Sequence, residues 1–537
     1  MVDVTNENFD ALLDGILSDI KSSSFIAVDT EFTGLLVDPA FKNSFFDDGA
    51  HRYQKLCANF HRVTICQIGL SIFKGVLHSN EYSVTSYNFY LRPCSAVSYD
   101  PSFLCQTSSI EFLQKYKFDF NKWLYGGIHF MNDDAAEMIQ SDLLAILKGE
   151  KVTDISYELR DHLSKVGSWA ASAEEGSTMT LNLKDNHSHR FLLRAMIRHR
   201  FDDLWSESDN GEVIIKKVSA DERATLLEQD PNGEIMVKDH IAELLGFTII
   251  FQHLAKHQKP LIFHNGLLDL MLVYKEFCRN LPHSYEEFKA SLHGKFPLIY
   301  DTKYIAAKLK THFKEKSEQG SNFLNNTSLS ELAASLKKDV GVMYFPKISH
   351  LGSDKYLQAD FHHEAGYDAY LTGRCFLSLS HIYAMSQLPS RESHRPMSPR
   401  EHVFSLKAFA NAVMVQRANI QYMNLSGTDR KPRSPPWLLV EGRNSKRVSP
   451  GMVYAALAQY GAVDVMPRNQ KSVLVASPSW ECTRDILRNF KADGPLRAVR
   501  YSRWKHSPLT RTLVWSGALV STGLSAWFIY STLKKPS

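Results

Sequence analysis

Two acidic side chains follow an apolar run near the start of the sequence. The segment "FIAVDTEFTGL", residues 25–35, begins with four apolar residues and then places Asp29 and Glu31 two positions apart. Such a run predicts a buried strand, and residues two apart in a strand point to the same side. Two carboxylates side by side on a core strand repel each other and are costly to remove from water. The pair therefore needs a basic side chain or a divalent cation.

Three further residues favour the cation. "HNGLLD" places Asp269 at a predicted strand-to-helix turn, and "HEAGYD" places His363 and Asp368 at the start of a predicted helix. Carboxylates suit Mg²⁺, with Mn²⁺ as an alternative. The predicted ligands of two such ions are Asp29, Glu31, Asp269 and Asp368. His363 is the predicted general base in hydrolysis of a phosphodiester. Taken singly, each acid is also typical of a strand end or a helix cap.

Composition sets the broad class. The chain has 537 residues, which predicts two to four domains, and its 44% hydrophobic and 22% charged residues exclude a disordered protein. A net charge of +4 is too small to argue for nucleic acid. The seven cysteines form no CxxC pair, which indicates a reducing compartment. The first 20 residues lack the pattern of a secretory signal, so we expect synthesis and folding in the cytosol.

Alternating strand and helix patterns predict an α/β core in two parts, residues 1–150 and 239–386. Its predicted strands are 25–28, 62–73, 86–93 and the start of 260–277, and its predicted helices are 6–21, 241–255, the end of 260–277 and 363–384. Between the two parts, 151–238 is a predicted small α+β insertion with a helix at 189–205 and a strand at 212–218. On that helix Arg190, Arg194 and Arg198 recur every four residues, as a phosphate-binding row or a solvated face.

A different pattern follows the core. Residues 387–435 are a predicted linker and helix, with the helical pattern at 403–423. Residues 436–503 predict the βαββαβ order of a ferredoxin-like or RRM-like domain. Its third strand, "KSVLVAS", lacks the aromatic residues that stack on RNA bases, so we expect mainly a packing or partner surface.

The end of the sequence predicts a membrane anchor. Residues 512–533 contain no charge, and 22 residues of helix can cross a hydrocarbon core of about 30 Å. The basic segment 504–511 precedes them and suits anionic lipid. We expect a single-pass protein with its catalytic part in the cytosol, in the endoplasmic reticulum membrane or the mitochondrial outer membrane. The alternative is a buried C-terminal helix.

Three quoted motifs resemble a known superfamily. "FIAVDTEFTGL", "HNGLLD" and "HEAGYDAYLTG" resemble the three exonuclease motifs of the DEDD superfamily, histidine subtype. "RYQKL", "NFYLRP", "FLCQTSSIEFL", "FDFNK", "YDTKYIA" and "NTSLSEL" resemble the poly(A)-specific ribonuclease (PARN) family, over most of residues 1–385. The uncharged C-terminal segment narrows the resemblance to the PARN-like domain-containing branch, whose members trim piRNA 3′ ends.

The resemblance implies an RNase H-like core, dependence on two Mg²⁺ ions and 3′-to-5′ hydrolysis of single-stranded RNA to 5′-mononucleotides. All five chemical positions of the motifs are filled here. Positions that contact nucleotides in the family match Phe32, Leu35 and Asn265. The implied partners are RNA held by an Argonaute/PIWI-type protein, a Tudor-domain membrane scaffold and a second copy of the chain. The alternatives are a poly(A) deadenylase of mRNA and a non-catalytic membrane RNA-binding adaptor.

Overall fold

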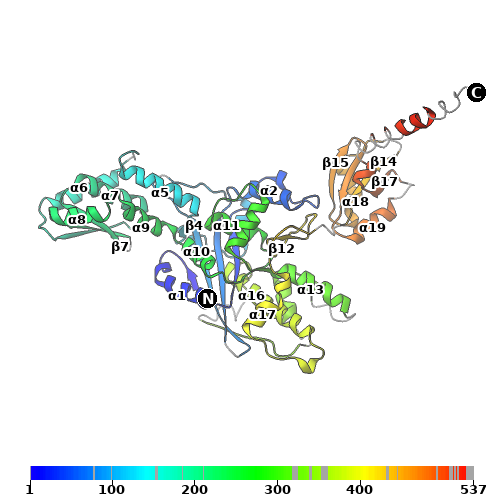
Figure 1. The fold of residues 1–537 in the computed structure, drawn as a ribbon, viewed down its shortest axis with the longest axis horizontal. Coiled ribbons are helices and arrows are strands. Elements are labelled where there is room, and N and C mark those ends of the chain that lie inside the picture. The colour runs from blue at the N-terminus through cyan, green and yellow to red at the C-terminus, as the bar shows by residue number, and fades with distance from the viewer. Residues whose placement is uncertain are drawn as a thin grey trace, which may run out of the picture. The chain divides into compact units, whose positions relative to one another are not determined.

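The computed structural model divides into two compact units. The first comprises Met1–Phe41, Gln54–Met414 and Asn424–Thr428, and the second comprises Lys42–Tyr53, Val415–Met423 and Asp429–Ser537 (Figure 1). The structure describes residues 2–76, 79–97, 99–151, 155–183, 186–209, 211–316, 324–337, 342–351, 361–430, 435–443, 446–490, 494–506, 512, 516 and 519–527.

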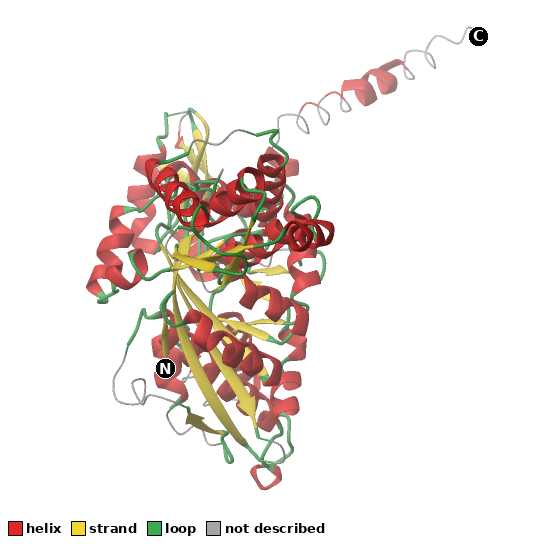
Figure 2. Cartoon of the chain, turned by 90° about the vertical axis from the view of Figure 1, so that its left-hand side faces the viewer, coloured by secondary structure: helices red, strands yellow, loops and turns green. Residues whose placement is uncertain are grey.

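A mixed sheet forms the centre of the first unit, as predicted for an α/β core, and helices flank its strands in Figure 2. The strand order is β1-β4-β3-β2-β9-β10, with β5 and β11 also paired to β4. β2 runs antiparallel to β3 and parallel to β9. The strands are β1 (Val2–Val4), β2 (Phe25–Phe32), β3 (Ile65–Gly75), β4 (Glu81–Pro93), β5 (Ile128–Phe130), β9 (Leu261–Phe263), β10 (Ile299–Asp301) and β11 (Lys347–His350).

The helices of this core confirm most of the predicted pattern. The predicted helix 241–255 is interrupted at Gly246, whose backbone has a φ of 48° and lies against His129. The helices are α1 (Phe9–Ser22), α2 (Gly49–Phe60), α3 (Thr107–Lys115), α4 (Phe120–Leu124), α5 (Asp133–Leu147), α10 (Thr248–His257), α11 (Leu267–Phe277), α12 (Tyr285–Lys295), α13 (Thr302–Lys316), α14 (Leu329–Leu336), α16 (Ala365–Ser386) and α17 (Pro399–Ser405).

One face of the sheet is shaped to receive α16. Phe25 of β2 stacks on Phe73 of β3 at 4.6 Å and meets Phe376 of α16 edge-on at 5.1 Å, so this end of the face is apolar. Further along, Gly69 of β3 lies so close to α16 that a Cβ there would stand 2.0 Å from the carbonyl oxygen of Ala365. The absence of a side chain at Gly69 therefore lets the start of α16 rest directly on the sheet.

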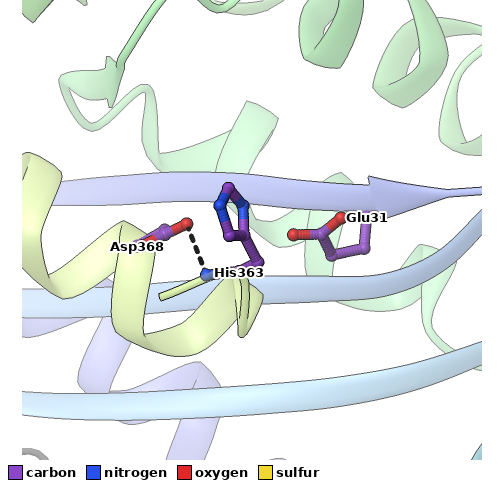
Figure 3. A group of neighbouring side chains, drawn as sticks. All are labelled: Glu31, His363 and Asp368. Atoms are coloured by element: carbon purple, nitrogen blue, oxygen red, sulfur yellow. Dashed lines mark hydrogen bonds between the residues drawn. The ribbon is translucent and has the colours of Figure 1, made fainter. Parts of the chain in front are cut away.

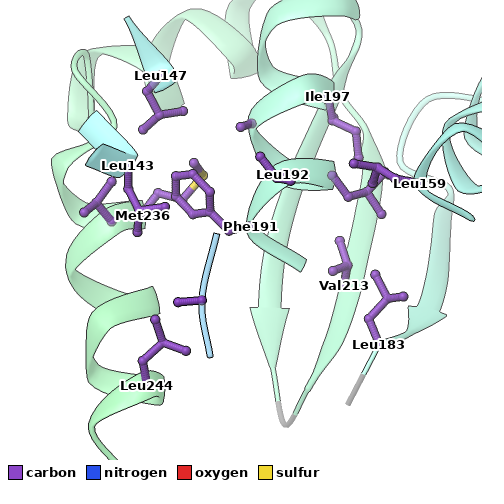
Figure 4. Packing of buried hydrophobic residues seen from close by; sticks show 14 of the residues in the cluster. Leu143, Leu147, Leu159, Leu183, Phe191, Leu192, Ile197, Val213, Met236 and Leu244 are labelled. Carbon is purple, nitrogen blue, oxygen red and sulfur yellow. The ribbon is translucent and has the colours of Figure 1, made fainter. Parts of the chain in front are cut away.

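The segment between the two parts of the core forms a small α+β structure. Its three strands pair in the order β6-β8-β7. Buried apolar side chains from α7, the sheet and α9 fill its centre, among them Phe191, Val213 and Met236 (Figure 4). The elements are α6 (Tyr157–Ala170), β6 (Thr178–Asn182), α7 (His187–Arg200), β7 (Leu204–Asp209), β8 (Glu212–Lys217), α8 (Ala220–Gln229) and α9 (Glu234–Leu245).

The second unit contains the predicted βαββαβ order. Its antiparallel sheet has the strand order β15-β16-β14-β17, and one buried cluster joins that sheet to α18 and α19. The elements are β14 (Leu438–Gly442), α18 (Pro450–Leu457), β15 (Asp464–Asn469), β16 (Ser472–Ala476), α19 (Trp480–Asn489), β17 (Leu496–Arg500) and the short α20 (Arg503–His506).

The other face of this RRM-like sheet is also covered. Leu439 and Leu474 pair across β14 and β16, and both are buried although neither belongs to the cluster beneath the helices. Residues 42–53 of the same unit lie here: the backbone N–H of Phe45 donates to Asp464 at 2.7 Å, and Phe46 meets Trp437 edge-on at 5.1 Å. The chain itself therefore occupies a sheet face that could otherwise have received bases.

The predicted helix at 403–423 is wrong. α17 ends at Ser405, and two short strands follow, β12 (Ala412–Met414) and β13 (Tyr422–Asn424). Asn411 explains the break, because it has a φ of 59°, its N–H donates to the carbonyl of Ile299 at 2.7 Å, and its side-chain oxygen accepts from the N–H of Ile299. This tertiary pairing overrides the helical periodicity.

The predicted membrane location requires correction. Part of 504–511 and half of 512–533 lie outside the described residues. Among the residues that the structure does describe, no helix combines the length and the apolar character needed to cross a bilayer. In the described part of this segment the longest continuous helical stretch is 519–527, which at about 1.5 Å per residue is too short for a hydrocarbon core of about 30 Å. The predictions that depended on this anchor are therefore not supported. They are the endoplasmic reticulum or mitochondrial outer membrane location, the contact with lipid and the membrane scaffold.

Candidate active site

The first two acids lie where β2 reaches the start of α16. Asp29 is paired with Gly69 of β3 and Glu31 with Gln67, so both carboxylates share the sheet face that α16 covers. Both acids are half-buried, and Thr30 between them is buried. The period of the strand thus places two acids on the same side, as predicted.

Asp269 reaches this place from the first turn of α11. Its Oδ1 accepts hydrogen bonds from the backbone N–H of Thr30 at 3.2 Å and from the Thr30 hydroxyl at 2.6 Å. The two residues are 239 positions apart in the sequence. Thr30 therefore joins the two carboxylates of β2 to the carboxylate of α11.

The start of α16 carries Asp368, the last of the four acids. The backbone N–H of Ala365 donates to the side-chain oxygen of Gln67 at 3.0 Å, and the N–H of Gly366 donates to that of Asn88 at 3.2 Å. These buried amides bind N–H groups that a helix cannot satisfy within its own first turn. They fix the start of α16, and with it Asp368, against β3 and β4.

Glu31, His363 and Asp368 form one group. They can each offer a ligand atom within 4.8 Å of the others (Figure 3). The backbone N–H of His363 also donates to Oδ2 of Asp368 at 3.1 Å. Two segments that are far apart in the sequence, one with Glu31 and one with His363 and Asp368, therefore meet at one point.

The four carboxylates share one electrostatic environment. Burial raises the pKa of Asp29 well above its ordinary value, and the charges of Asp368, Asp269 and Glu31 raise it further. Burial, followed by the charges of Asp368 and Asp269, likewise raises the pKa of Glu31. Burial raises the pKa of Asp269 to about 6, against the lowering effect of the Thr30 hydrogen bonds. Burial also raises the pKa of Asp368 to about 7.

This donor set fits divalent cations. Clustered carboxylates that repel each other are stabilised as anions by a positive charge placed between them. Oxygen donors from acidic side chains are the ligands that Mg²⁺ and Mn²⁺ prefer. The residues at the site therefore match the chemistry of the predicted ions, and the residues that would hold them are Asp29, Glu31, Asp269 and Asp368.

The positions expected to contact nucleotides lie around these acids. Phe32 ends β2 and is half-buried, with its ring 6.5 Å from that of Phe60. Leu35 is 52% exposed, and its N–H donates to Gln106. Asn265 lies in the turn before α11 with a φ of 60°. Phe32 and Asn265 adjoin the elements that carry the acids, and their contacts with RNA stay predictions.

A fifth acid, Asp301, supports the turn that holds Asn265. It is fully buried at the end of β10, and its Oδ1 accepts from the N–H groups of Asn265 and Lys303, both at 2.9 Å, while Oδ2 accepts from Met414. The sequence pattern alone predicts no role for Asp301. Its position at the end of an apolar strand, in "YDTKYIA", is the one signal that the sequence offered.

The three arginines of the insertion do not form an exposed row. Arg190 is buried, donates to the carbonyl of Leu183 and pairs with Glu243 at 3.0 Å. Arg194 is buried and lines a cavity of about 280 Å³. Arg198 pairs with Asp230 and lies over the ring of Trp205. These side chains face the centre of the insertion. Both predictions for them, a phosphate-binding row and a solvated helix face, are therefore wrong.

The chain is similar to known ribonucleases over most of its length. The family model described as CAF1 family ribonuclease matches residues 4–376. The pre-piRNA 3′-exonuclease trimmer of Bombyx mori is 31% identical over 99% of this chain and 99% of its own length. Poly(A)-specific ribonuclease PNLDC1 of Mus musculus is 31% identical over 97% of this chain and 98% of its own length. Poly(A)-specific ribonuclease PARN of Xenopus laevis is 28% identical over 94% of this chain and 81% of its own length.

The matched region contains every acid of the candidate site as well as His363. The first two relatives align with this chain over nearly its whole length and theirs. The chain therefore belongs to the CAF1 family of ribonucleases, in the PARN-type group, and is an enzyme.

Proposed function

We propose that the chain is a 3′-to-5′ exoribonuclease that shortens single-stranded RNA by metal-dependent hydrolysis. The observation that carries the proposal is the convergence of Asp29, Glu31, Asp269 and Asp368, contributed by β2, α11 and α16, beside His363. This convergence favours an active nuclease over an RNA-binding adaptor, which needs no such cluster of repelling charges.

The chemistry follows from the residue types. The four carboxylates would hold two divalent ions, which when bound would lower the pKa of the attacking water and stabilise the leaving oxygen. A ring nitrogen of His363 accepts the proton of that water. The water oxygen becomes bonded to phosphorus as the bond to the 3′ oxygen of the preceding nucleotide breaks. The leaving 3′ oxygen takes up a proton from solvent, so the products are a 5′-mononucleotide and a shortened RNA with a free 3′ hydroxyl.

The substrate proposed within this class is a piRNA precursor. The Bombyx mori relative is a trimmer of pre-piRNA 3′ ends, and the alignment covers almost all of both chains. Phe32 and Leu35 are proposed contacts of the terminal nucleotides, through base stacking and apolar packing that do not select one base. Asn265 is a further proposed contact, through the hydrogen-bonding groups of its side-chain amide. A trimmed length would then be set by an Argonaute-type protein that shields the rest of the RNA.

A direct test is the shortening of a 5′-labelled RNA in Mg²⁺, followed together with the release of unlabelled mononucleotides from its 3′ end. Glu31→Gln keeps the size of the side chain and removes one ligand charge, so we expect a loss of at least about 100-fold in kcat. Glu111→Gln, an exposed acid on α3, is the matched control and should keep full activity. Equal, negligible release by the wild type and by Glu31→Gln would overturn the proposal and support the adaptor.

A second candidate is deadenylation of mRNA, which the names of the mouse and frog relatives favour. The two substrates are distinguished by digesting RNAs with mixed 3′ tails and with pure poly(A), each free and bound to an Argonaute-type protein. Similar rates on both tails, and a stop at the protein boundary, are the expected results for a trimmer. Strict dependence on adenosine would indicate a deadenylase.

A further inference from the structure

The imidazole of His363 has an unusual set of neighbours. His363 precedes α16 and has a φ of 66°, a left-handed conformation that is uncommon for residues other than glycine. Its backbone N–H donates a hydrogen bond to the carboxylate of Asp368. Among the residues that the structure describes, no hydrogen bond to either ring nitrogen is recorded. A proton-accepting imidazole is ordinarily oriented by such a bond, so the orientation of this ring needs another source.

Two aromatic rings, that of Phe112 in α3 and that of Tyr116 directly after α3, lie against the imidazole. The centroid of the Tyr116 ring is 4.0 Å from that of His363, and the Phe112 ring meets it edge-on at 4.8 Å. Phe112 and Tyr116 also contact each other at 4.9 Å, which closes a triangle of three rings. The two contacts of Phe112 have the separations of attractive aromatic pairs, and the Tyr116 ring lies closer still to the imidazole.

The segment that carries these rings is itself fixed to the acids. Before α3, the N–H of Gln106 donates to the carbonyl of Thr33 at 2.8 Å, and its side chain bonds the backbone of the loop that follows β2. Within α3, Leu113 is buried in a cluster with Cys66, whose thiol donates to the carbonyl of Glu31. The aromatic rings therefore occupy a fixed place relative to Glu31.

We propose that Tyr116, with Phe112, is a positioning residue that holds the His363 ring in the orientation needed to accept the proton of the attacking water. This inference rests on the proposed nuclease function and adds the residue that orients its general base. Tyr116 acts through its ring, because the ring makes the contact with His363. Loss of the ring should misplace the imidazole while the acids stay where they are.

The experiment compares Tyr116→Phe, which keeps the ring, with Tyr116→Leu, which keeps apolar bulk without a ring. Tyr125→Leu is the matched control, since Tyr125 is 81% exposed. Phe112→Leu is a second variant at a 40% exposed position, where folding is least at risk. We expect Tyr116→Leu to lower kcat about 10-fold with KM within about twofold, because small displacements of a reacting group cost rate rather than binding. Tyr116→Phe and Tyr125→Leu should stay within about twofold of the wild type.

A second readout needs neither RNA nor metal. In protein labelled with ¹³C-histidine, the His363 resonance is identified by its absence in His363→Gln. The Tyr116 ring at 4.0 Å should impose a ring-current shift on it. That shift should disappear in Tyr116→Leu, decrease in Phe112→Leu and persist in Tyr116→Phe and Tyr125→Leu.

An unchanged His363 resonance in Tyr116→Leu would overturn the inference, as would an equal loss of kcat in Tyr116→Phe and Tyr116→Leu, which would assign the effect to the hydroxyl. A wild type that releases no mononucleotides would instead overturn the proposed function. The resonance shift would still decide whether Tyr116 orients His363, so the two failures are distinguishable.

Discussion

Thr30 of β2 links this strand to α11 at the candidate site. Replacing it with valine removes the hydroxyl that donates to Asp269 at 2.6 Å and leaves the shape of the side chain nearly unchanged. Because the lost hydrogen bond lowered the pKa of Asp269, that pKa should rise and the carboxylate should bind a cation less readily. We expect the Mg²⁺ concentration at half-maximal activity to increase roughly 10-fold. Thr225→Val, at an exposed position on α8, should leave it unchanged.

The raised pKa values predict how the metal-free protein responds to pH. Asp269 and Asp368 have pKa values of about 6 and about 7, above their ordinary value of 3.8. The folded state therefore binds their protons more tightly than the unfolded state does, and this contribution to stability is lost as the pH rises from about 4 to about 7. In EDTA, the thermal unfolding midpoint should fall across this range, and Mg²⁺ should restore it at neutral pH. A midpoint in EDTA that rises from pH 4 to 7 would contradict this interpretation.

At the scale of elements, the contact between β3 and α16 assembles the site. A methyl group at Gly69 would stand 2.0 Å from the carbonyl oxygen of Ala365, which is backbone and can move only with the helix. Gly69→Ala should destabilise the protein by about 1–3 kcal/mol and reduce activity, since it displaces Asp368. Gly15→Ala, in α1 with open space around it, should stabilise the protein by up to about 1 kcal/mol. Urea unfolding and mononucleotide release measure both effects.

The position of residues 42–53, which cover one face of the RRM-like sheet, depends on the buried side chain of Arg52. Arg52 pairs with Asp47 at 3.1 Å, and both side chains are almost completely buried. It also donates to the backbone carbonyl groups of Ser44, Gln416 and Arg417. Arg52→Met leaves Asp47 without its cation, so we expect a loss of about 3 kcal/mol in the free energy of unfolding. Arg484→Met, at a largely exposed position, should change it by less than about 0.5 kcal/mol. Equal stability of the two variants would show that the cover does not depend on Arg52.

At the scale of the whole molecule, the sequence predicts those features that depend on neighbouring residues in the chain. Asp29, Glu31, Asp269, His363 and Asp368 could be selected because each adjoins a recognisable strand or helix. The βαββαβ order could also be predicted, because its strands and helices alternate clearly.

What the sequence could not supply is the set of contacts between distant segments. Thr30 meets Asp269, and Gln67 and Asn88 bind the start of α16, only through the strand order of the sheet. The same limit explains the error at Arg190, Arg194 and Arg198, whose spacing defined a helix face without showing what that face packs against. Asn411 likewise ended a helical pattern through its pairing with Ile299.

The central claim is that carboxylates from β2, α11 and α16 together hold two divalent cations. Anomalous X-ray diffraction from crystals of the full chain soaked in Mn²⁺ tests it most directly. The account predicts two manganese peaks about 4 Å apart, bound by Asp29, Glu31, Asp269 and Asp368, and loss of at least one peak in Glu31→Gln. Absence of manganese from these four residues, with manganese bound elsewhere in the same crystals, would contradict it.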